Sequence, residues 1–245
     1  MNYYDYGKTL NAEGVMTALI GGGVGPGPTP DPHEYVDLGL PSGLLWATNN
    51  IQDEDGNELY FAWGETSGYT SGQVITHEKN FSWGGKEYEN DYKFGPYDEN
   101  EYTNYGMTRY NHNDNLSALT ITNEPPVNEI DDAAVVNWGN GWRMPTKEDF
   151  MELSANTTTA WTVSDNGISG ATFTSTINGN TLFIPAVGYA GNGGVGNVGG
   201  YGYCWSSSLD DRNVDTAWRL YFDSGSRNIN TDTRYTGFSV RPVRF

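Results

Sequence analysis

The C-terminal half of the chain is divided into short apolar segments by glycine and asparagine. Each segment is rich in β-branched and aromatic residues and is bounded by turn-forming residues, which is the pattern of a short strand. The segments are 171–176, 181–189, 203–208, 217–222 and 237–245. This succession predicts a meander of short antiparallel strands.

Two helix candidates precede the meander. Residues 130–138 form the first, and Asp131 and Asp132 fit its first turn, where the helix dipole favours carboxylates. The second begins at Thr146, because Thr146 and Asp149 match a capping box in which each side chain bonds the other residue's amide. The residues expected to face inward from it are Phe150, Met151 and Leu153. Helices followed by a strand meander indicate an α+β domain and not a doubly wound sheet.

Residues 21–32 separate a short N-terminal stretch from the rest of the chain. Their sequence, GGGVGPGPTPDP, combines glycine flexibility with proline stiffness and has nothing to bury, so we expect a linker and a domain boundary near His33. The expected organisation is a tail over 1–32 and one domain over 33–245. A short helix is expected within 11–20, and it is too short to be stable alone. Its apolar positions are Val15, Met16, Leu19 and Ile20.

The segment after the linker predicts further strands and a long insertion. Residues 35–47 favour two strands about a Pro-Ser-Gly turn, and 58–65 favour another strand that follows a turn at 53–57. Residues 66–128 are rich in Asn, Gly, Tyr and charge with little periodicity, which is typical of an irregular surface insertion.

The charge balance excludes some partners. The chain has 13 Lys and Arg against 31 Asp and Glu, and its formal charge is −18. Nucleic acid binding needs a basic face, and an anionic membrane surface would repel this chain. Residues 201–245 carry five Asp and six Arg, so this end is nearly neutral and the negative field belongs to the remainder.

Cys204 is the single cysteine, which excludes an internal disulfide and a multi-cysteine zinc site. We expect a small buried hydrophobe next to Trp205, the alternative being a reactive thiol.

No run of 18 apolar residues occurs, so no membrane insertion is expected. Residues 15–24 resemble a signal-peptide core only faintly, since acidic residues precede them and no cleavage site follows; neither an export signal nor a lipid anchor is expected.

The sequence contains no recognisable catalytic constellation. His33, His77 and His112 lack metal-ligand spacing, and the glycine-rich runs do not sit between a clear strand and an amphipathic helix. Asp53 and Asn57 lie in a cluster of oxygen side chains that could suggest calcium, but a hairpin turn explains the same residues. We therefore expect a protein that is not an enzyme and has no cofactor and no metal.

Residues 201–236 are the most informative segment. Along 218–223, alternation places Trp218, Leu220 and Phe222 on one face and Arg219, Tyr221 and Asp223 on the other, so one face is core and the other is solvent or ligand. Lys, Glu, Gln and Met are absent throughout 201–236. The polar residues that remain are those encoded by pyrimidine-ending codons derived from an Asn codon, and they match the mixture used by recognition surfaces.

Several motifs resemble those of a known family. In order they are HEYVDLGLPSGLLWAT (33–48), YFAWGE (60–65), WGNGWRMPT (138–146), LFIPAVGY (182–189), CWSSSL (204–209) and GFSVRPVRF (237–245). The set resembles the Fibrobacter succinogenes major paralogous domain family, also found in Bacteroides-type bacteria. Its C-terminal run is similar to the variable proteins of diversity-generating retroelements. The insertion at 66–128 has no counterpart in it.

The resemblance implies a C-type-lectin-like fold, calcium-independent ligand binding and a variable region over about 201–236. It implies a fixed frame that includes Trp205, Ala217, Trp218, Leu220 and Phe222. The implied ligand-binding positions are Tyr201, Tyr203, Asp210, Arg212, Asn213, Asp215, Thr216, Arg219, Tyr221, Asp223, Arg227, Asn230, Thr231, Asp232, Thr233, Tyr235 and Thr236.

The expected function is receptor binding or adhesion. The favoured hypothesis is a phage tail protein in the virion that binds a bacterial surface protein or glycan and joins other tail proteins through residues 1–32. The alternative is a bacterial cell-surface adhesin or lectin-like structural protein. The ligand and the oligomeric state do not follow from the sequence.

Overall fold

The structure is a computed structural model. It describes residues 31–83, 91–95, 107, 110, 129–139, 141–164, 166–210, 212, 213 and 215–245, with the backbone of 8–10 and 16–18. The chain forms two compact units, Met1–Pro32 and His33–Phe245, and the second begins at the residue where the linker pattern places the boundary.

The N-terminal unit corrects one prediction. Its strands β1 (Lys8–Leu10) and β2 (Met16–Ala18) pair in antiparallel register, so the helix expected within 11–20 is wrong. A helix this short gains too little from its few hydrogen bonds to offset nucleation, and the β-branched Thr17 favours an extended backbone. Val15, Leu19 and Ile20 lie outside the described residues.

The second unit is α+β, with mostly antiparallel strands and few helices, as the sequence predicts. The helices of its described part are α1 (Ser71–Ile75), α2 (Ala133–Trp138) and α3 (Lys147–Ala155), with a 3-10 turn η1 (Glu129–Asp131) before α2. The strands fall into three-stranded sheets and one small hairpin. The sheets are β13 (Val243–Arg244), β4 (Leu45–Ala47) and β3 (Tyr35–Asp37); β5 (Thr157–Val163), β6 (Ser169–Ser175) and β7 (Thr181–Pro185); and β10 (Gly202–Leu209), β11 (Thr216–Phe222) and β12 (Arg227–Thr233). The hairpin pairs β8 (Tyr189–Gly191) with β9 (Gly194–Gly196).

Local capping fixes where α2 and α3 begin. Asp132 is the N-cap of α2 and accepts hydrogen bonds from the amides of Ala134 (2.8 Å) and Val135 (3.1 Å). The capping box predicted for α3 is confirmed, because Thr146 and Asp149 exchange side-chain-to-amide hydrogen bonds of 3.1 and 2.7 Å. Buried side chains of α3 include Phe150 and Leu153, as expected. Met151 is 53% exposed, so its inward placement was wrong; only positions three or four apart share the inner face.

The strand expected over 58–65 is not a continuous strand. Glu58 bridges to Gln52, Tyr60 to Tyr69, and Phe61 to Phe238. Since each residue pairs with a different segment, the backbone is extended without forming a ladder. The expected turn before it is confirmed: the Asp53 carboxylate accepts hydrogen bonds from the amides of Asp55 and Asn57 and from the Asn57 side chain, at 2.8 to 3.0 Å.

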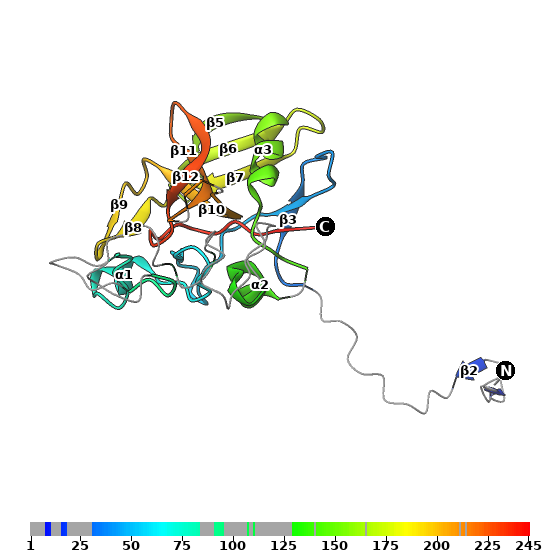
Figure 1. Cartoon of the computed structure of the whole chain (residues 1–245). Coiled ribbons are helices and arrows are strands. Elements are labelled where there is room, and N and C mark those ends of the chain that lie inside the picture. The colour runs from blue at the N-terminus through cyan, green and yellow to red at the C-terminus, as the bar shows by residue number, and fades with distance from the viewer. Residues whose placement is uncertain are drawn as a thin grey trace. The chain divides into compact units, whose positions relative to one another are not determined.

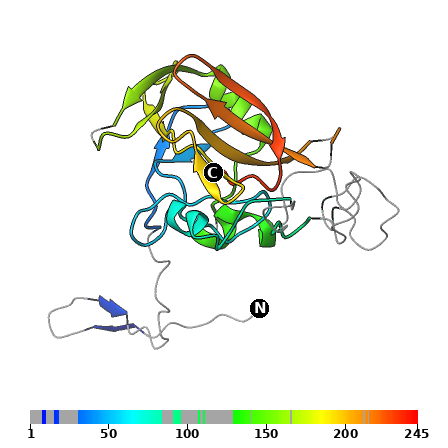
Figure 2. The same cartoon turned by 90° about the vertical axis from the view of Figure 1, so that its left-hand side faces the viewer.

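Two hydrophobic clusters lie on opposite faces of the β10–β11–β12 sheet. Cys204, Leu220 and Phe222 project from one face into a cluster shared with α3 and with β6, β7 and β4. Trp205 and Ala217 project from the other face into an aromatic cluster that includes Phe81 and Phe238. Figures 1 and 2 show the larger sheets and α3 in one layer and α1 and α2 in another. The prediction that Cys204 is buried is therefore confirmed.

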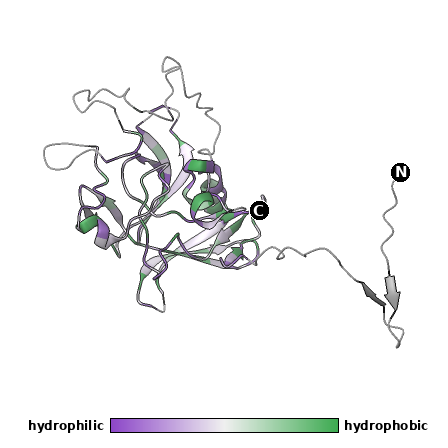
Figure 3. Cartoon of the chain, turned by 90° about the horizontal axis from the view of Figure 1, so that it is seen from below, coloured by the Kyte–Doolittle hydropathy of each residue, from purple (hydrophilic) through white to green (hydrophobic). Residues whose placement is uncertain are grey.

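Hydrophobic residues are dispersed over the elements of the domain. Figure 3 shows hydrophobic and hydrophilic residues mixed along helices and strands alike. Within the described residues, no helix is long and apolar enough to cross a membrane.

Candidate binding surface

The turn between β11 and β12 sets the register of the candidate site. The Asp223 amide donates to the Ser226 carbonyl (3.0 Å), and the Asp223 carboxylate accepts the amides of Gly225 and Ser226, each at 2.7 Å. A turn of this kind is favoured by Asp at its first position and Gly inside it. It holds β12 against β11 without a residue slip, from Phe222 opposite Arg227 to Thr216 opposite Thr233.

Cross-strand pairing then brings distant residues onto one face. Tyr203 on β10 lies opposite Tyr221 on β11, and Tyr221 lies opposite Asn228 on β12. In the next row of this face, Arg219 lies between Trp205 and Asn230. Directly opposed side chains share a face of the sheet. We call this side, with Tyr201 at its edge, the tyrosine face; its polar members are Tyr201, Tyr203, Arg219, Tyr221, Asn228, Asn230 and Asp232.

Three tyrosines form the aromatic centre of the tyrosine face. The ring of Tyr221 lies 5.3 Å from that of Tyr203 and 5.7 Å from that of Tyr201, centroid to centroid. Tyr203 stacks on the buried ring of Phe238 at 4.7 Å with an interplanar angle of 5°. Tyr201 is exposed, whereas Tyr203 and Tyr221 are half-buried. The rings are thus supported from below and remain open to solvent on one side.

Arg219 is buried beneath these rings, which corrects the expectation that it is exposed. Only 8% of the residue is accessible. Its guanidinium carbon lies 4.8 Å from the ring centre of Tyr203 and 5.4 Å from that of Tyr221, and its Nε donates to Asp232 Oδ2 at 2.9 Å. Simple alternation misplaced Arg219 because it assumed that only one face of the sheet is covered. Here Arg219 supports the tyrosines and orients Asp232.

Tyr221 and Asp223 form a second polar contact at the turn. The Tyr221 hydroxyl donates to Asp223 Oδ2. This hydrogen bond, with those from Gly225 and Ser226, lowers the pKa of Asp223 to about 2. Desolvation, followed by the bond to the Asp223 carboxylate, raises the pKa of Tyr221 to about 12. The pair therefore presents one negative charge and one neutral phenol at neutral pH.

The implied ligand positions do not form one continuous exposed surface. Thr231 and Thr233 lie opposite Trp218 and Thr216, so they belong to the other face of the sheet. Arg227 donates to the Ser154 carbonyl (3.0 Å), which fastens β12 to the end of α3. The implied ligand positions thus occupy both sides of the sheet, because successive side chains of a strand point to opposite sides.

Exposure differs widely among the implied ligand positions. Buried positions are Asp210, Arg219 and Thr236. Exposed positions are Tyr201, Arg212, Asn213 and Asn230. The half-buried positions are Tyr203, Asp215, Thr216, Tyr221, Asp223, Arg227, Thr231, Asp232, Thr233 and Tyr235. The Asp210 carboxylate stabilises the loop between β10 and β11, because it accepts hydrogen bonds from the Arg212 amide (3.0 Å) and the Thr216 hydroxyl (3.1 Å).

The residues of the implied frame are buried, with one exception. Trp205, Ala217, Leu220 and Phe222 are buried. Trp218 is half-buried, and the Lys147 ammonium lies 4.8 Å from the centre of its ring. Trp218 is on the same face as Leu220, but it lies where β11 meets the N-terminus of α3, so its ring reaches the surface.

Sequence reasoning missed Arg234 and Trp83. Arg234 is fully buried, and its guanidinium carbon lies within 6.0 Å of four aromatic ring centres, those of Trp63, Tyr92, Phe94 and Tyr110. Trp83 lies 5.6 Å from Tyr235, centroid to centroid. These contacts connect the insertion to the variable region, and the aperiodic sequence of the insertion gave no signal for them.

Metal binding has no candidate site among the described residues. No group of three or more His, Cys, Asp or Glu side chains in this part of the chain could hold a metal ion. His33 stacks on Trp138 at 3.8 Å, and His77 Nδ1 lies 3.1 Å from Asn80 Oδ1. His112 lies outside the described residues. The absence of an enzymatic activity stays a prediction.

Comparison with protein-family models, with curated proteins and with solved structures finds no match for this chain.

Proposed function

We propose that this chain is a non-enzymatic, calcium-independent binding protein with a C-type-lectin-like fold, and that its tyrosine face recognises a ligand on a bacterial surface. The aromatic centre formed by Tyr201, Tyr203 and Tyr221 supports the proposal most directly. Tyrosine supplies a large contact area at low conformational entropy, and neighbouring Asn, Asp and Arg supply adaptable hydrogen bonds. The motifs quoted above extend the proposal to a variable protein of a diversity-generating retroelement.

The favoured setting for this function is a phage tail, with residues 1–32 joining the domain to other tail proteins. Sequencing of the neighbouring DNA tests this setting without any ligand. A reverse transcriptase gene beside a near-copy of the 201–244 coding region supports diversification, and adjacent tail genes support the phage setting. Neighbouring genes for cell-surface export would favour a bacterial adhesin instead.

Binding to intact cells tests the recognition surface. Fluorescently labelled protein is added to a panel of gut bacterial strains and to a neutral and acidic glycan array, and the double variant Tyr201→Ala/Tyr221→Ala is compared with Tyr35→Ala. Tyr35 is an exposed tyrosine on β3, outside the tyrosine face, and serves as the matched control. We expect the double variant to lose binding and the control to retain it. Equal binding by both variants would contradict the proposed surface.

A further inference from the structure

We infer that the insertion supplies an additional ligand-contacting residue, Trp83, beside the variable region. This inference rests on the proposed function. It concerns a residue outside 201–236, whose identity does not change when the sequence of that region varies. The supporting observations are the position of the Trp83 ring, the anchoring of the segment that carries it, and its indole N–H, which has no acceptor among the described residues.

The Trp83 ring extends an aromatic row toward the variable region. It lies 5.6 Å from the ring of Tyr235, an implied ligand position, and 6.3 Å from the ring of Tyr92, with which it stacks. Trp83, Tyr203 and Tyr235 are all half-buried and pack on the same aromatic cluster. Trp83 thus stands beside Tyr235, an implied ligand position, and has a partly accessible ring.

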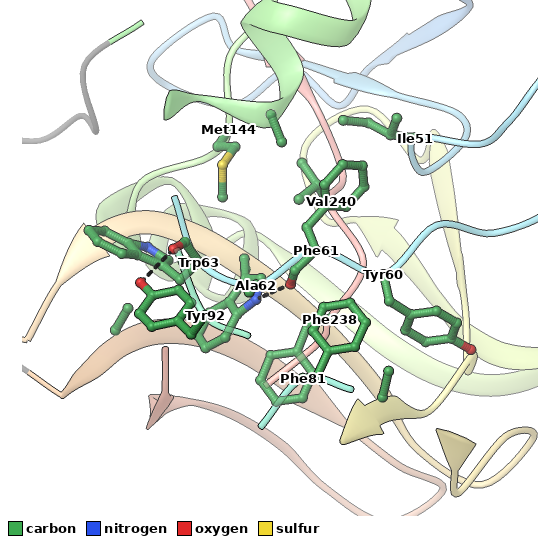
Figure 4. Packing of buried hydrophobic residues seen from close by; sticks show 14 of the residues in the cluster. Ile51, Tyr60, Phe61, Ala62, Trp63, Phe81, Tyr92, Met144, Phe238 and Val240 are labelled. Atoms are coloured by element: carbon green, nitrogen blue, oxygen red, sulfur yellow. Dashed lines mark hydrogen bonds between the residues drawn. The ribbon is translucent and has the colours of Figure 1, made fainter. Parts of the chain in front are cut away.

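The segment leading to Trp83 is fixed to the domain by packing on one side. The Phe81 ring is buried so close to Gly237 that a Cβ at Gly237 would lie 2.9 Å from it. The Asn80 carbonyl accepts the Gly193 amide of the β8–β9 turn at 2.9 Å. Figure 4 shows Phe81 and Phe238 within the aromatic cluster that these contacts complete. A side chain at position 237 would therefore force Phe81 or Ala190 to shift.

Buried charges fix the same segment from the other side. The Lys79 ammonium is buried against the Glu65 carboxylate, with its Nζ 2.9 Å from Oε2, and donates to the Asp91 carbonyl. The Asp91 carboxylate in turn accepts the amides of Asn80 and Ser82. Breaking a buried ion pair leaves an uncompensated charge in the interior. The Lys79–Glu65 pair therefore favours the one arrangement of this segment in which both charges stay paired.

Arg234 joins the insertion to the end of β12. Its Nε donates to the Tyr92 hydroxyl (2.9 Å) and its Nη1 to the Tyr110 carbonyl (3.1 Å). The Tyr92 hydroxyl donates to the Trp63 carbonyl (2.8 Å), as Figure 4 shows. Arg234 precedes Tyr235 in the chain, and Tyr92 stacks with Trp83. Arg234 is therefore linked to both members of the Trp83–Tyr235 pair, to Tyr235 as its chain neighbour and to Trp83 through Tyr92. A preorganised contact of this kind costs little entropy on binding.

The polar atom of Trp83 is available for a partner. Its indole Nε1 makes no hydrogen bond to a described residue and is not enclosed. Tryptophan N–H groups usually find an acceptor when they are buried, and Trp is among the residues that dominate binding energy at interfaces. A partly exposed ring with a free donor suits a ligand group that is apolar and carries a hydrogen-bond acceptor, such as an aliphatic or aromatic side chain beside a backbone carbonyl.

A selection experiment on a defined target tests the inference without knowledge of the natural ligand. Two display libraries are made in which Tyr201, Tyr203, Tyr221 and Asn230 are randomised, one with Trp83 and one with Trp83→Ala. Both are panned on immobilised lysozyme, a basic protein suited to this acidic chain. We expect more and tighter binders from the Trp83 library. Trp83→Ala in its best binders should weaken binding at least tenfold.

Control variants separate contact from folding. Trp161→Ala removes a half-buried tryptophan from β5, on the opposite cluster, and should leave the affinity of the same binders unchanged. Trp83→Phe keeps an aromatic ring, smaller than the indole, and loses the N–H, so an intermediate affinity is expected with an unchanged melting temperature. If both libraries give equal binders, Trp83 is not a contact although the variable face recognises targets. If neither library gives binders, the proposed function fails and the inference fails with it.

Discussion

At the scale of single residues, buried arginines hold the domain together. Arg241 is fully enclosed and donates to the carbonyls of Ala47 (3.1 Å) and Phe183 (3.2 Å), linking three segments that are distant in sequence. Desolvation lowers its pKa to about 10, so it remains charged at neutral pH. Arg234 and Arg219 use aromatic faces and a few acceptors in the same way. The planar guanidinium suits such sites, because it stacks on rings and is less strongly hydrated than an ammonium.

The thiol of Cys204 should be unreactive in the folded protein. It is buried on β10 with Ser239 Oγ 3.5 Å away, and desolvation raises its pKa to about 11. The thiolate is the reactive form, so burial and a raised pKa act together against modification. We expect negligible labelling by a disulfide reagent at pH 8 and one thiol per chain in guanidinium chloride. Rapid labelling of the native protein would place Cys204 at the surface.

Asp223 should make stability depend on pH only under acidic conditions. Its pKa is lowered from 3.8 to about 2 by the Tyr221 hydroxyl and two turn amides. A depressed folded-state pKa stabilises the protein above the unfolded value and loses this contribution as pH falls through the folded value. The stability difference between the wild type and Asp223→Asn should therefore be constant from pH 7 to 5 and shrink between about pH 4 and 2.

Urea unfolding at pH 7, 4, 3 and 2 measures this difference directly. The unfolding midpoints of the two proteins are compared where the denaturant slope m is the same for both. A midpoint shift at constant m reflects a change in stability and not in the compactness of the denatured or native state. A difference that stays constant down to pH 2 would mean that the Tyr221–Asp223 hydrogen bond does not form in solution.

At the scale of elements, the sequence predicted those helix starts and turns that are fixed by hydrogen bonds between residues close together in the chain. The capping box at Thr146 and the turn at Asp53 each depend on residues within five positions, so the sequence alone located them. A second capping box begins α1, where Thr70 and Gln73 satisfy each other's backbone amides, and the same pattern could have located that helix. The strand β12, RNINTDT, lacks hydrophobic alternation. It is extended because the turn at Asp223 aligns it with β11, a cause that no property of its own residues reveals.

Two tryptophans of neighbouring strands should differ in their contribution to stability. Trp205 on β10 is fully buried, and its Nε1 donates to the Phe61 carbonyl at 2.8 Å. Trp205→Ala should cost about 3–5 kcal/mol as a large-to-small core change. Trp218 on β11 is half-buried, so Trp218→Ala should cost at most about 1.5 kcal/mol, although alternation placed this side chain in the core.

Thermal or urea unfolding of the two alanine variants decides between these values. The Trp205→Ala variant is the internal standard, because both substitutions remove the same side-chain atoms. Equal losses would mean that Trp218 is as enclosed as Trp205, and that the position of α3 over β11 differs from the one described.

At the scale of the whole molecule, the candidate site depends on how two cores share one sheet. The sequence pattern correctly identified Leu220 and Phe222 as one buried face. It could not show that the aromatic cluster covers part of the other face, because Phe81 and Phe238 are more than 150 positions apart and no periodicity connects them. Arg219 is buried for this reason, and the docked insertion beside Tyr235 was equally invisible to sequence reasoning.

The molecule as a whole should bind and melt independently of divalent cations. A calcium site needs several converging oxygen ligands that are free to coordinate. On the tyrosine face, the Asp232 carboxylate is bonded to Arg219, and at its turn the Asp223 carboxylate accepts from Tyr221 and two amides. In the neighbouring loop, Asp210 accepts from Arg212 and Thr216. A bound ion would have to break these contacts and would meet the charge of nearby arginines.

The experiment compares the protein after exhaustive EDTA treatment with protein in millimolar calcium. We expect the same melting temperature and the same binding to cells in both conditions, since an ion that bound only the folded state would raise the melting temperature as its concentration rose above its Kd. Binding to lysozyme by a selected library member serves as a second readout that does not depend on the natural ligand. A loss of either binding in EDTA that calcium restores would place part of the recognition chemistry on a metal ion and away from the tyrosine and arginine contacts.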